Sequence, residues 1–152
     1  IIVSCFVKYF LKVNSAACYV DVGSGAGFPG VILSIFEPNR LVYLIEPREK
    51  RCFFLKEVKR KLQLQNLHVV CSRVEGFVLP SSPIGLITNR ALGMRDDFLQ
   101  CCRRLLSVDG VVVELLTPDI LKKCSIPEEA SVLHYSLPPD LSSRVVVGYG
   151  LK

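Results

Sequence analysis

The feature that most constrains this chain is a glycine-rich turn directly behind a short apolar run. The stretch YVDVGSGAGFPGVIL, residues 19–33, holds four glycines within eight residues. Two overlapping registers fit it: G-x-G-x-G from Gly23, Gly25 and Gly27, and the dinucleotide fingerprint G-x-G-x-x-G ending at Gly30. Both registers predict a strand, a tight ligand-binding turn and a helix, which is the opening unit of an α/β fold.

The rest of the chain alternates strand-like apolar runs with helical patterns, which predicts a parallel sheet covered on both faces. We expect strands at 18–23, 40–46, 67–72, 84–91 and 111–116, and helices at 27–37, 48–61 and 95–106. Residues 107–110 are expected to turn the chain into the last of these strands. Two β runs at 130–138 and 143–150 leave no room for a helix between them, so they predict an antiparallel hairpin.

The hairpin is typical of one fold class. Class I methyltransferases close an open, mostly parallel, seven-stranded Rossmann-like sheet in this way, with helices on both faces. A standard dinucleotide-binding half would instead continue with βα units. We therefore expect the class I methyltransferase fold, in a single domain spanning residues 1–152.

Half the residues are apolar, but charges, glycines and prolines interrupt every apolar stretch, and no signal-peptide pattern is visible. We therefore expect a cytoplasmic protein without a membrane span. Residues 1–13 have helical spacing, and we expect them to be the last helix of an N-terminal segment that is missing or truncated. The seven cysteines include no C-x-x-C pair, so buried free thiols are favoured over disulfides or a zinc site, and we expect no metal.

One acid favours S-adenosylmethionine at the turn, and a second fits the adenosine of either cofactor. Asp21, at the tip of the first strand, suits the cationic sulfonium and ammonium groups of that cofactor and would oppose a pyrophosphate. Glu46, at the end of the second strand, can accept the ribose hydroxyls of an adenosine in either cofactor. We expect Asp21, Gly23, Gly25 and Glu46 to hold the cofactor, while a nicotinamide-dependent oxidoreductase remains the alternative.

The segment after the second strand is strongly basic. REKRCFFLKEVKRK, residues 48–61, carries seven cations against two acids. Such a helix is a candidate phosphate-binding surface, although a solvated helix face explains the charges equally well.

Several blocks in series resemble the RsmG/GidB family of bacterial 16S ribosomal RNA guanine-N7 methyltransferases. They are DVGSGAGFPG, EPREKRCFFLKEV, LQLQNLHVVCSRVEGF and ITNRA. The resemblance implies methyl transfer from S-adenosylmethionine to 16S ribosomal RNA or the 30S subunit by a cytoplasmic protein, which we expect to be a monomer. It implies cofactor contacts at Gly23, Phe28, Glu46, Val74, Glu75 and Arg90, with Arg90 as the catalytic residue that orients the guanine. It places RNA contacts at Lys50, Arg51 and Arg144, and we extend these to Lys56, Lys59 and Arg60.

The chain departs from the family pattern at two positions. Leu116 stands where the family carries a lysine after the fifth strand, and Val145 stands where a histidine is common. A methyltransferase-like protein that binds RNA or a partner without transfer is therefore a second alternative. A small-molecule methyltransferase on the same fold is a third. No general base is evident, as expected for guanine N7, which already carries an in-plane lone pair.

Overall fold

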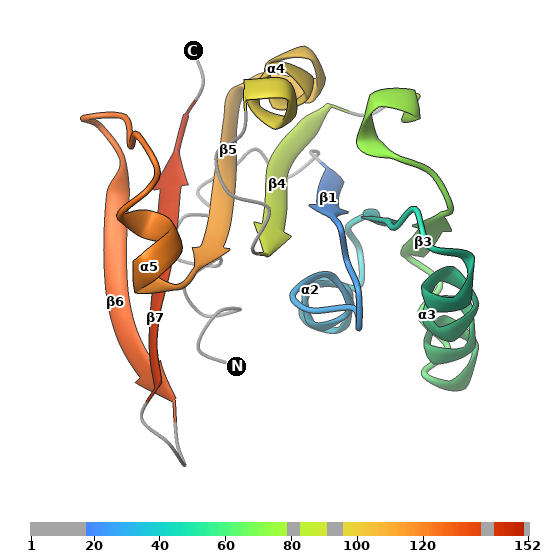
Figure 1. Cartoon of the computed structure of the whole chain (residues 1–152). Coiled ribbons are helices and arrows are strands. Elements are labelled where there is room, and N and C mark those ends of the chain that lie inside the picture. Colours follow the sequence, from blue (N-terminus) through green and yellow to red (C-terminus); the bar gives the residue numbers. More distant parts are fainter. Residues whose placement is uncertain (1–17, 79–82, 91–95, 138–141, 151–152) are drawn as a thin grey trace.

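A computed structural model describes residues 18–78, 83–90, 96–137 and 142–150. Residues 1–13, which we expected to be helical, lie outside these ranges. The centre of the structure is a seven-stranded sheet in the order β3-β2-β1-β4-β5-β7-β6 (Figure 1). Its strands are β1 (Cys18–Val22), β2 (Val42–Ile45), β3 (Leu67–Val70), β4 (Ile84–Arg90), β5 (Leu106–Leu116), β6 (Ser131–Leu137) and β7 (Ser142–Tyr149).

The strand directions confirm the predicted fold. The first five strands run parallel, and β7 pairs antiparallel with both β5 and β6. The chain order reverses beside β1, between β2 and β4, and that is where open α/β sheets bind ligands at the carboxyl ends of their strands. A ligand-binding site is therefore expected at the carboxyl ends of β1, β2 and β4.

Helices lie on both faces of the sheet (Figure 1). On one face, α2 (Gly30–Phe36) and α3 (Glu49–Lys61) pack Val31, Leu33 and Leu55 onto β1 and β2. On the other face, α4 (Asp96–Leu105) packs Phe98 and Cys102 against β4 and β5. Two short elements complete the described fold: the 3₁₀ turn η1 (Val74–Gly76) after β3 and α5 (Pro118–Leu121) after β5.

Two element boundaries differ from the sequence prediction by three residues or more. Helix α2 begins only at Gly30, because Gly23, Gly25 and Gly27 take positive φ angles of 69°, 58° and 93° that no right-handed helix accommodates. Residues 107–110 are not a turn, because β5 already begins at Leu106 and runs through them with a register irregularity against β4. A Cβ on Gly110 would lie 2.5 Å from Cγ of Leu106, so the glycine makes room for this bulge.

The helices of the described ranges are all too short or too polar to cross a membrane.

Candidate active site

The site is a cleft at the carboxyl edge of the sheet. It brings together the end of β1, the residues after β2, the segment after β3 and the start of α4. The residues that line it are Val22, Gly23, Ile45, Pro47, Ser72, Arg73, Val74, Glu75, Asp97 and Phe98. Three of the predicted cofactor residues, Gly23, Val74 and Glu75, are thus part of one cleft.

Asp21 holds the C-terminal end of the glycine turn through Gly30. Its side chain is 1% exposed; Oδ1 accepts a hydrogen bond from the Thr88 hydroxyl at 2.7 Å, and Oδ2 accepts one from the Gly30 N–H at 3.3 Å. Burial raises the pKa of Asp21 to about 6, and the bonds from Thr88 and Gly30 moderate that rise. Both carboxylate oxygens face protein groups, so direct contact between Asp21 and the cofactor stays a prediction.

Gly30 joins the first turn of α2 to the sheet. A Cβ at this position would collide with Cδ2 of Leu44 on β2 and would lie 2.9 Å from Oδ2 of Asp21. The glycine therefore allows helix and sheet to approach closely. The third glycine of a dinucleotide fingerprint has the same packing role, so this contact does not distinguish the two registers.

Glu46 holds the middle of the glycine turn through Gly25. The residue follows β2, its side chain is almost fully buried, and Oε2 accepts a hydrogen bond from the Gly25 N–H at 3.0 Å. Oε1 accepts a hydrogen bond from the Arg48 N–H at 3.0 Å, directly before the start of α3. The prediction that Glu46 binds ribose hydroxyls is untested, but the carboxylate lies beside the turn as that role requires.

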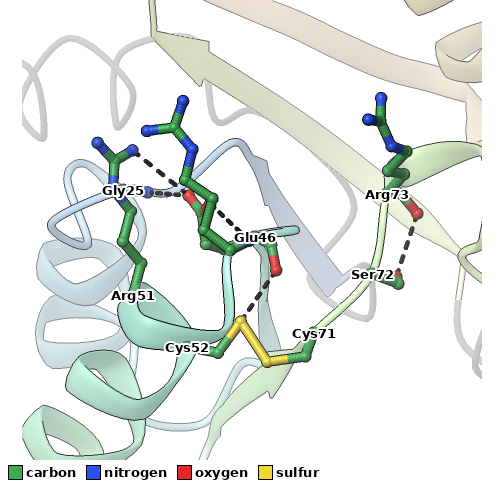
Figure 2. Close-up of a disulfide and its surroundings, with 8 residues drawn as sticks. Gly25, Glu46, Arg51, Cys52, Cys71, Ser72 and Arg73 are labelled. Carbon is green, nitrogen blue, oxygen red and sulfur yellow. Dashed lines mark hydrogen bonds and ion pairs between the residues drawn. A yellow bond between two sulfur atoms is a disulfide. The ribbon is translucent and has the colours of Figure 1, made fainter.

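Two arginines make the open side of the turn positive. A Cβ built on Gly25 would lie 3.6 Å from Nη1 of Arg51 and 3.8 Å from Nη2 of Arg90. Arg51 also lies 3.8 Å from Oε2 of Glu46 and reaches toward the turn from α3 (Figure 2). The sequence argument placed an acid, Asp21, at this position. The structure buries that acid and presents two guanidinium groups instead, which suits a carboxylate or phosphate.

The segment after β3 forms the opposite wall. Val74 is buried, Glu75 is exposed, and the Glu75 carbonyl accepts a hydrogen bond at 3.1 Å from Nη2 of Arg104 on α4. With Ile45 and Phe98, Val74 gives the cleft an apolar surface of the kind that takes an aromatic ring. The sequence analysis did not single out Phe98, because a phenylalanine within a helical pattern is typical of a core position and does not indicate a ligand site.

The cysteine prediction was wrong for one pair. Cys52, in the first turns of α3, and Cys71, just after β3, form a disulfide with their Cα atoms 5.9 Å apart (Figure 2). Nineteen residues separate them, and no spacing rule indicates the pairing. Adjacent strand ends bring them together, since β3 lies beside β2 and α3 begins close behind β2. Among the other described cysteines, Cys101, Cys102 and Cys124 carry free thiols.

The predicted RNA-contacting residues fall into two places. Lys56, Lys59 and Arg60 line a shallow cavity at the far end of α3, with Gln63 and Gln65. Arg60 is also ion-paired with Glu57 at 2.8 Å, and Lys50 is exposed near the start of the helix. Arg144 lies across the sheet on β7, opposite Tyr135 of β6. The structure therefore does not bring Arg144 together with the α3 residues.

Phe28 and the two departures from the family pattern are clearly placed. Phe28 is 52% exposed at the rim of the glycine turn. Leu116 and Val145 are cross-strand neighbours on β5 and β7, both are buried, and they pack in the same core cluster. The two replacements are thus a single apolar contact near the carboxyl edge of the sheet.

Comparison with known proteins identifies the family. A family model described as "rRNA small subunit methyltransferase G" matches residues 2–126. The "Ribosomal RNA small subunit methyltransferase G" of Methylobacillus flagellatus is 33% identical over 129 residues, which cover 85% of this chain and 59% of that protein. Its counterpart in Pseudomonas paraeruginosa is 46% identical over 87 residues, covering 57% of this chain and 40% of that protein.

A solved structure supports the fold. The SAM-dependent O-methyltransferase of Thermotoga maritima superposes with a TM-score of 0.75 at 15% identity, covering 95% of this chain and 63% of that chain. At that identity the likeness concerns the fold alone. The present chain spans a little over half the length of the Methylobacillus relative. With a family model matched over most of its residues and the class I methyltransferase fold in place, this chain belongs to the rRNA small subunit methyltransferase G family.

Proposed function

We propose that this chain transfers a methyl group from S-adenosylmethionine to N7 of a guanine in 16S ribosomal RNA. The observation that carries the proposal is the cleft beside the glycine turn, in a chain whose family is named for small-subunit rRNA methylation. The cytoplasm, where ribosomal RNA is modified in bacteria, is the proposed location, and a monomer is the proposed working form.

The residues at the cleft fit S-adenosylmethionine. Glu46 would accept the ribose hydroxyls with the lone pairs that Gly25 and Arg48 leave open. The adenine would lie between Val74 and Phe98, with Glu75 at its edge. Arg51 and Arg90 would hold the methionine carboxylate over Gly25, where a Cβ would occupy the space. Asp21 would act through the turn, as a positioning residue that fixes Gly30.

The proposed reaction requires the protein mainly to position the cofactor and the guanine. S-Adenosylmethionine, when bound, supplies a methyl group on a cationic sulfur, and guanine N7 offers a lone pair without prior deprotonation. The chain therefore has to align the two partners in a dry cleft, and proximity of this kind accounts for much of the rate in such displacements. Arg90, exposed at the end of β4 and next to the turn, would orient the guanine as it enters.

The basic residues would hold the RNA backbone. Lys50 and the group Lys56, Lys59 and Arg60 lie along α3, while Arg144 lies on β7. These groups lie on opposite sides of the cleft within the sheet order. An RNA that crosses the carboxyl edge could therefore meet Lys50 and Arg144, and it would reach Lys56, Lys59 and Arg60 only by also running along α3. Its affinity would depend on salt through counterion release.

A nucleoside assay tests the proposed reaction. The protein is incubated with labelled S-adenosylmethionine and 16S RNA or 30S particles from a strain without the native enzyme, and the digested nucleosides are analysed by mass spectrometry. Labelled N7-methylguanosine is expected. A different methylated nucleoside, or no product in the presence of measurable cofactor binding, contradicts the proposal.

A second candidate has one observation in its favour. The buried Leu116–Val145 contact replaces two polar residues that the family resemblance places near the site. A protein that binds RNA without methyl transfer would tolerate this change. RNA binding together with cofactor binding, but without N7-methylguanosine, would identify this candidate.

A further inference from the structure

The Cys52–Cys71 disulfide joins the first turn of α3 to the segment after β3, whose residues Ser72–Glu75 line the cleft. Cys52 directly follows Arg51, whose guanidinium lies beside Gly25, and Cys71 directly precedes Ser72 of the opposite wall. Figure 2 shows the bridge below Glu46, with Arg51 on one side and Ser72 and Arg73 on the other. The bond therefore ties the start of α3, which carries Arg51 beside the glycine turn, to one wall of the cleft.

The two sulfur atoms differ in accessibility. Cys71 is exposed, whereas Cys52 is 1% exposed beneath the start of α3. In an exchange reaction, an incoming thiol or disulfide would therefore reach Cys71 before Cys52, and Cys52 would be the internal resolving cysteine. One accessible and one sheltered cysteine within bonding distance is the arrangement that thiol–disulfide exchange requires.

We propose that Cys52 and Cys71 form an exchange site for small aliphatic thiols and disulfides of the glutathione class, and that the closed bond tightens the cleft. In the oxidising direction the Cys71 thiolate attacks oxidised glutathione, whose S–S bond breaks and releases one glutathione thiolate. The Cys52 thiolate then attacks the Cys71 sulfur and releases the second glutathione. The two protons of the protein thiols end on the two glutathione molecules, so atoms and electrons balance.

The link from the bond to the cleft is Glu46. The Cys52 sulfur lies 2.9 Å from the Glu46 carbonyl oxygen, and the Glu46 carboxylate accepts the Gly25 N–H. In the dithiol form the Cys52 S–H donates to that carbonyl, but the segment Ser72–Glu75 loses its covalent tie to α3. The adenosine wall is then ordered only when a ligand binds, and ordering on binding lowers affinity.

This inference rests on the proposed function, because the effect of the disulfide is measured as ligand affinity at the proposed cofactor cleft. It also gives the disulfide a role that suits a reducing compartment, where cytosolic disulfides are usually transient and redox-sensing. A permanently closed structural bond would be the expectation for an oxidising compartment.

The exchange chemistry is tested first, without any cofactor. The full chain is equilibrated in buffers of increasing oxidised-to-reduced glutathione ratio, the thiols are trapped by alkylation, and the peptides are analysed by mass spectrometry. Reversible joint loss of Cys52 and Cys71 alkylation is expected. The Cys52→Ser variant should instead carry one glutathione on Cys71. A pair that stays reduced with excess oxidised glutathione, or oxidised with excess reduced glutathione, overturns the proposal.

The effect on the cleft is tested by calorimetry with S-adenosylhomocysteine. The oxidised chain should bind about threefold to tenfold more tightly than the chain in a phosphine reductant, as expected for ordering one or two side chains in advance. Cys71→Ser, a change at an exposed position, should bind like the reduced chain in both buffers. Cys101→Ser on α4 is the matched control and should keep the full redox response.

The outcomes separate this inference from the proposed function. Equal affinity in both redox states leaves the methyltransferase proposal intact and overturns the coupling between bond and cleft. No binding of S-adenosylhomocysteine in either state overturns the proposed cofactor and, with it, the coupling. The glutathione titration decides the exchange site independently in both cases.

Discussion

The main-chain N–H of Gly25 donates a 3.0 Å hydrogen bond to Oε2 of Glu46, although 21 residues separate them. This bond connects the turn after β1 with the tip of β2, two of the places where the sequence indicated cofactor contacts. Glu46 thereby shapes the turn, and we propose that its carboxylate also accepts the ribose hydroxyls of the cofactor. A change at Glu46 should affect both.

Replacement of Glu46 by glutamine should weaken S-adenosylhomocysteine binding about 10-fold to 100-fold, because a hydrogen bond to a charged group contributes roughly 1.5–3 kcal/mol. Calorimetry measures the change. Glu49→Gln, at the exposed first residue of α3, is the control and should bind normally. Normal binding by Glu46→Gln would show that the carboxylate does not contact the ribose.

Replacement of Gly25 by alanine should abolish measurable binding. The added Cβ would enter the space between Arg51 and Arg90, and φ of +58° disfavours any side chain by about 1–2 kcal/mol. Gly150→Ala adds a methyl group where nothing lies within 4 Å, so this variant should bind and unfold like the parent. Chemical denaturation of both variants separates loss of folding from loss of the site.

Asp21 should make stability fall as the pH rises from about 4 to 6. The folded state holds the Asp21 proton up to a pKa of about 6, while an unfolded aspartate releases it near 3.9. The stabilisation is therefore present below the unfolded pKa and is lost as the pH rises through the folded pKa, by up to about 3 kcal/mol.

Asp21→Asn should remove this part of the pH dependence, because it keeps the size of the side chain without the titrating group. Urea unfolding at pH 4.5 and 7.5 gives the difference between parent and variant. Equal pH profiles for the two proteins would show that Asp21 does not titrate in this window.

Tyr149 and Glu114 form a buried pair that should contribute to stability. The Tyr149 hydroxyl donates to Oε1 of Glu114 at 2.6 Å, Asn89 donates to Oε2 at 3.0 Å, and burial raises the pKa of the Tyr149 phenol. Tyr149→Phe should lower the free energy of unfolding by about 1–3 kcal/mol, because it leaves a buried carboxylate oxygen without this donor. Tyr135→Phe, on half-buried β6, is the control and should change little.

RNA affinity should depend on the α3 cations one by one. Lys56→Ala should lower the slope of log affinity against log salt by about 1, and so should Lys59→Ala, if each meets one phosphate. Arg103→Ala, on the exposed face of α4, is the control with no expected change. Fluorescence anisotropy with a 16S RNA fragment over a salt series measures the slopes. Unaltered slopes in both lysine variants would assign these charges to the solvated face of the helix.

The sheet could be predicted from the sequence because its signals are local. Apolar runs such as LHVV, and the hairpin at 130–150, predict strands from their own residues, whichever strands lie next to them in the sheet. The start of β5 was missed because SVDG has turn composition, and only its pairing with β4 shows that it continues the strand. A bulge depends on two strands at once, so one strand's sequence does not reveal it.

The candidate site was predictable in its location but not in its charges. The positions of Gly23, Gly25 and Glu46 follow from strand ends, which the sequence marks well. The orientation of Asp21 depends on Thr88, which is 67 residues away, and the Cys52–Cys71 bond depends on the pairing of β2 with β3. Residues that come into contact only because their strands are neighbours in the sheet cannot be recognised from the spacing within one segment of the sequence.

The two-sided support of the glycine turn has a thermodynamic consequence. Asp21 holds its far end through Gly30, and Glu46 holds its middle through Gly25, so its backbone is already fixed by protein bonds. A ligand at the turn therefore meets a rigid receptor there. The binding heat capacity should then scale with the apolar area covered by the ligand, with no additional contribution from folding of the loop.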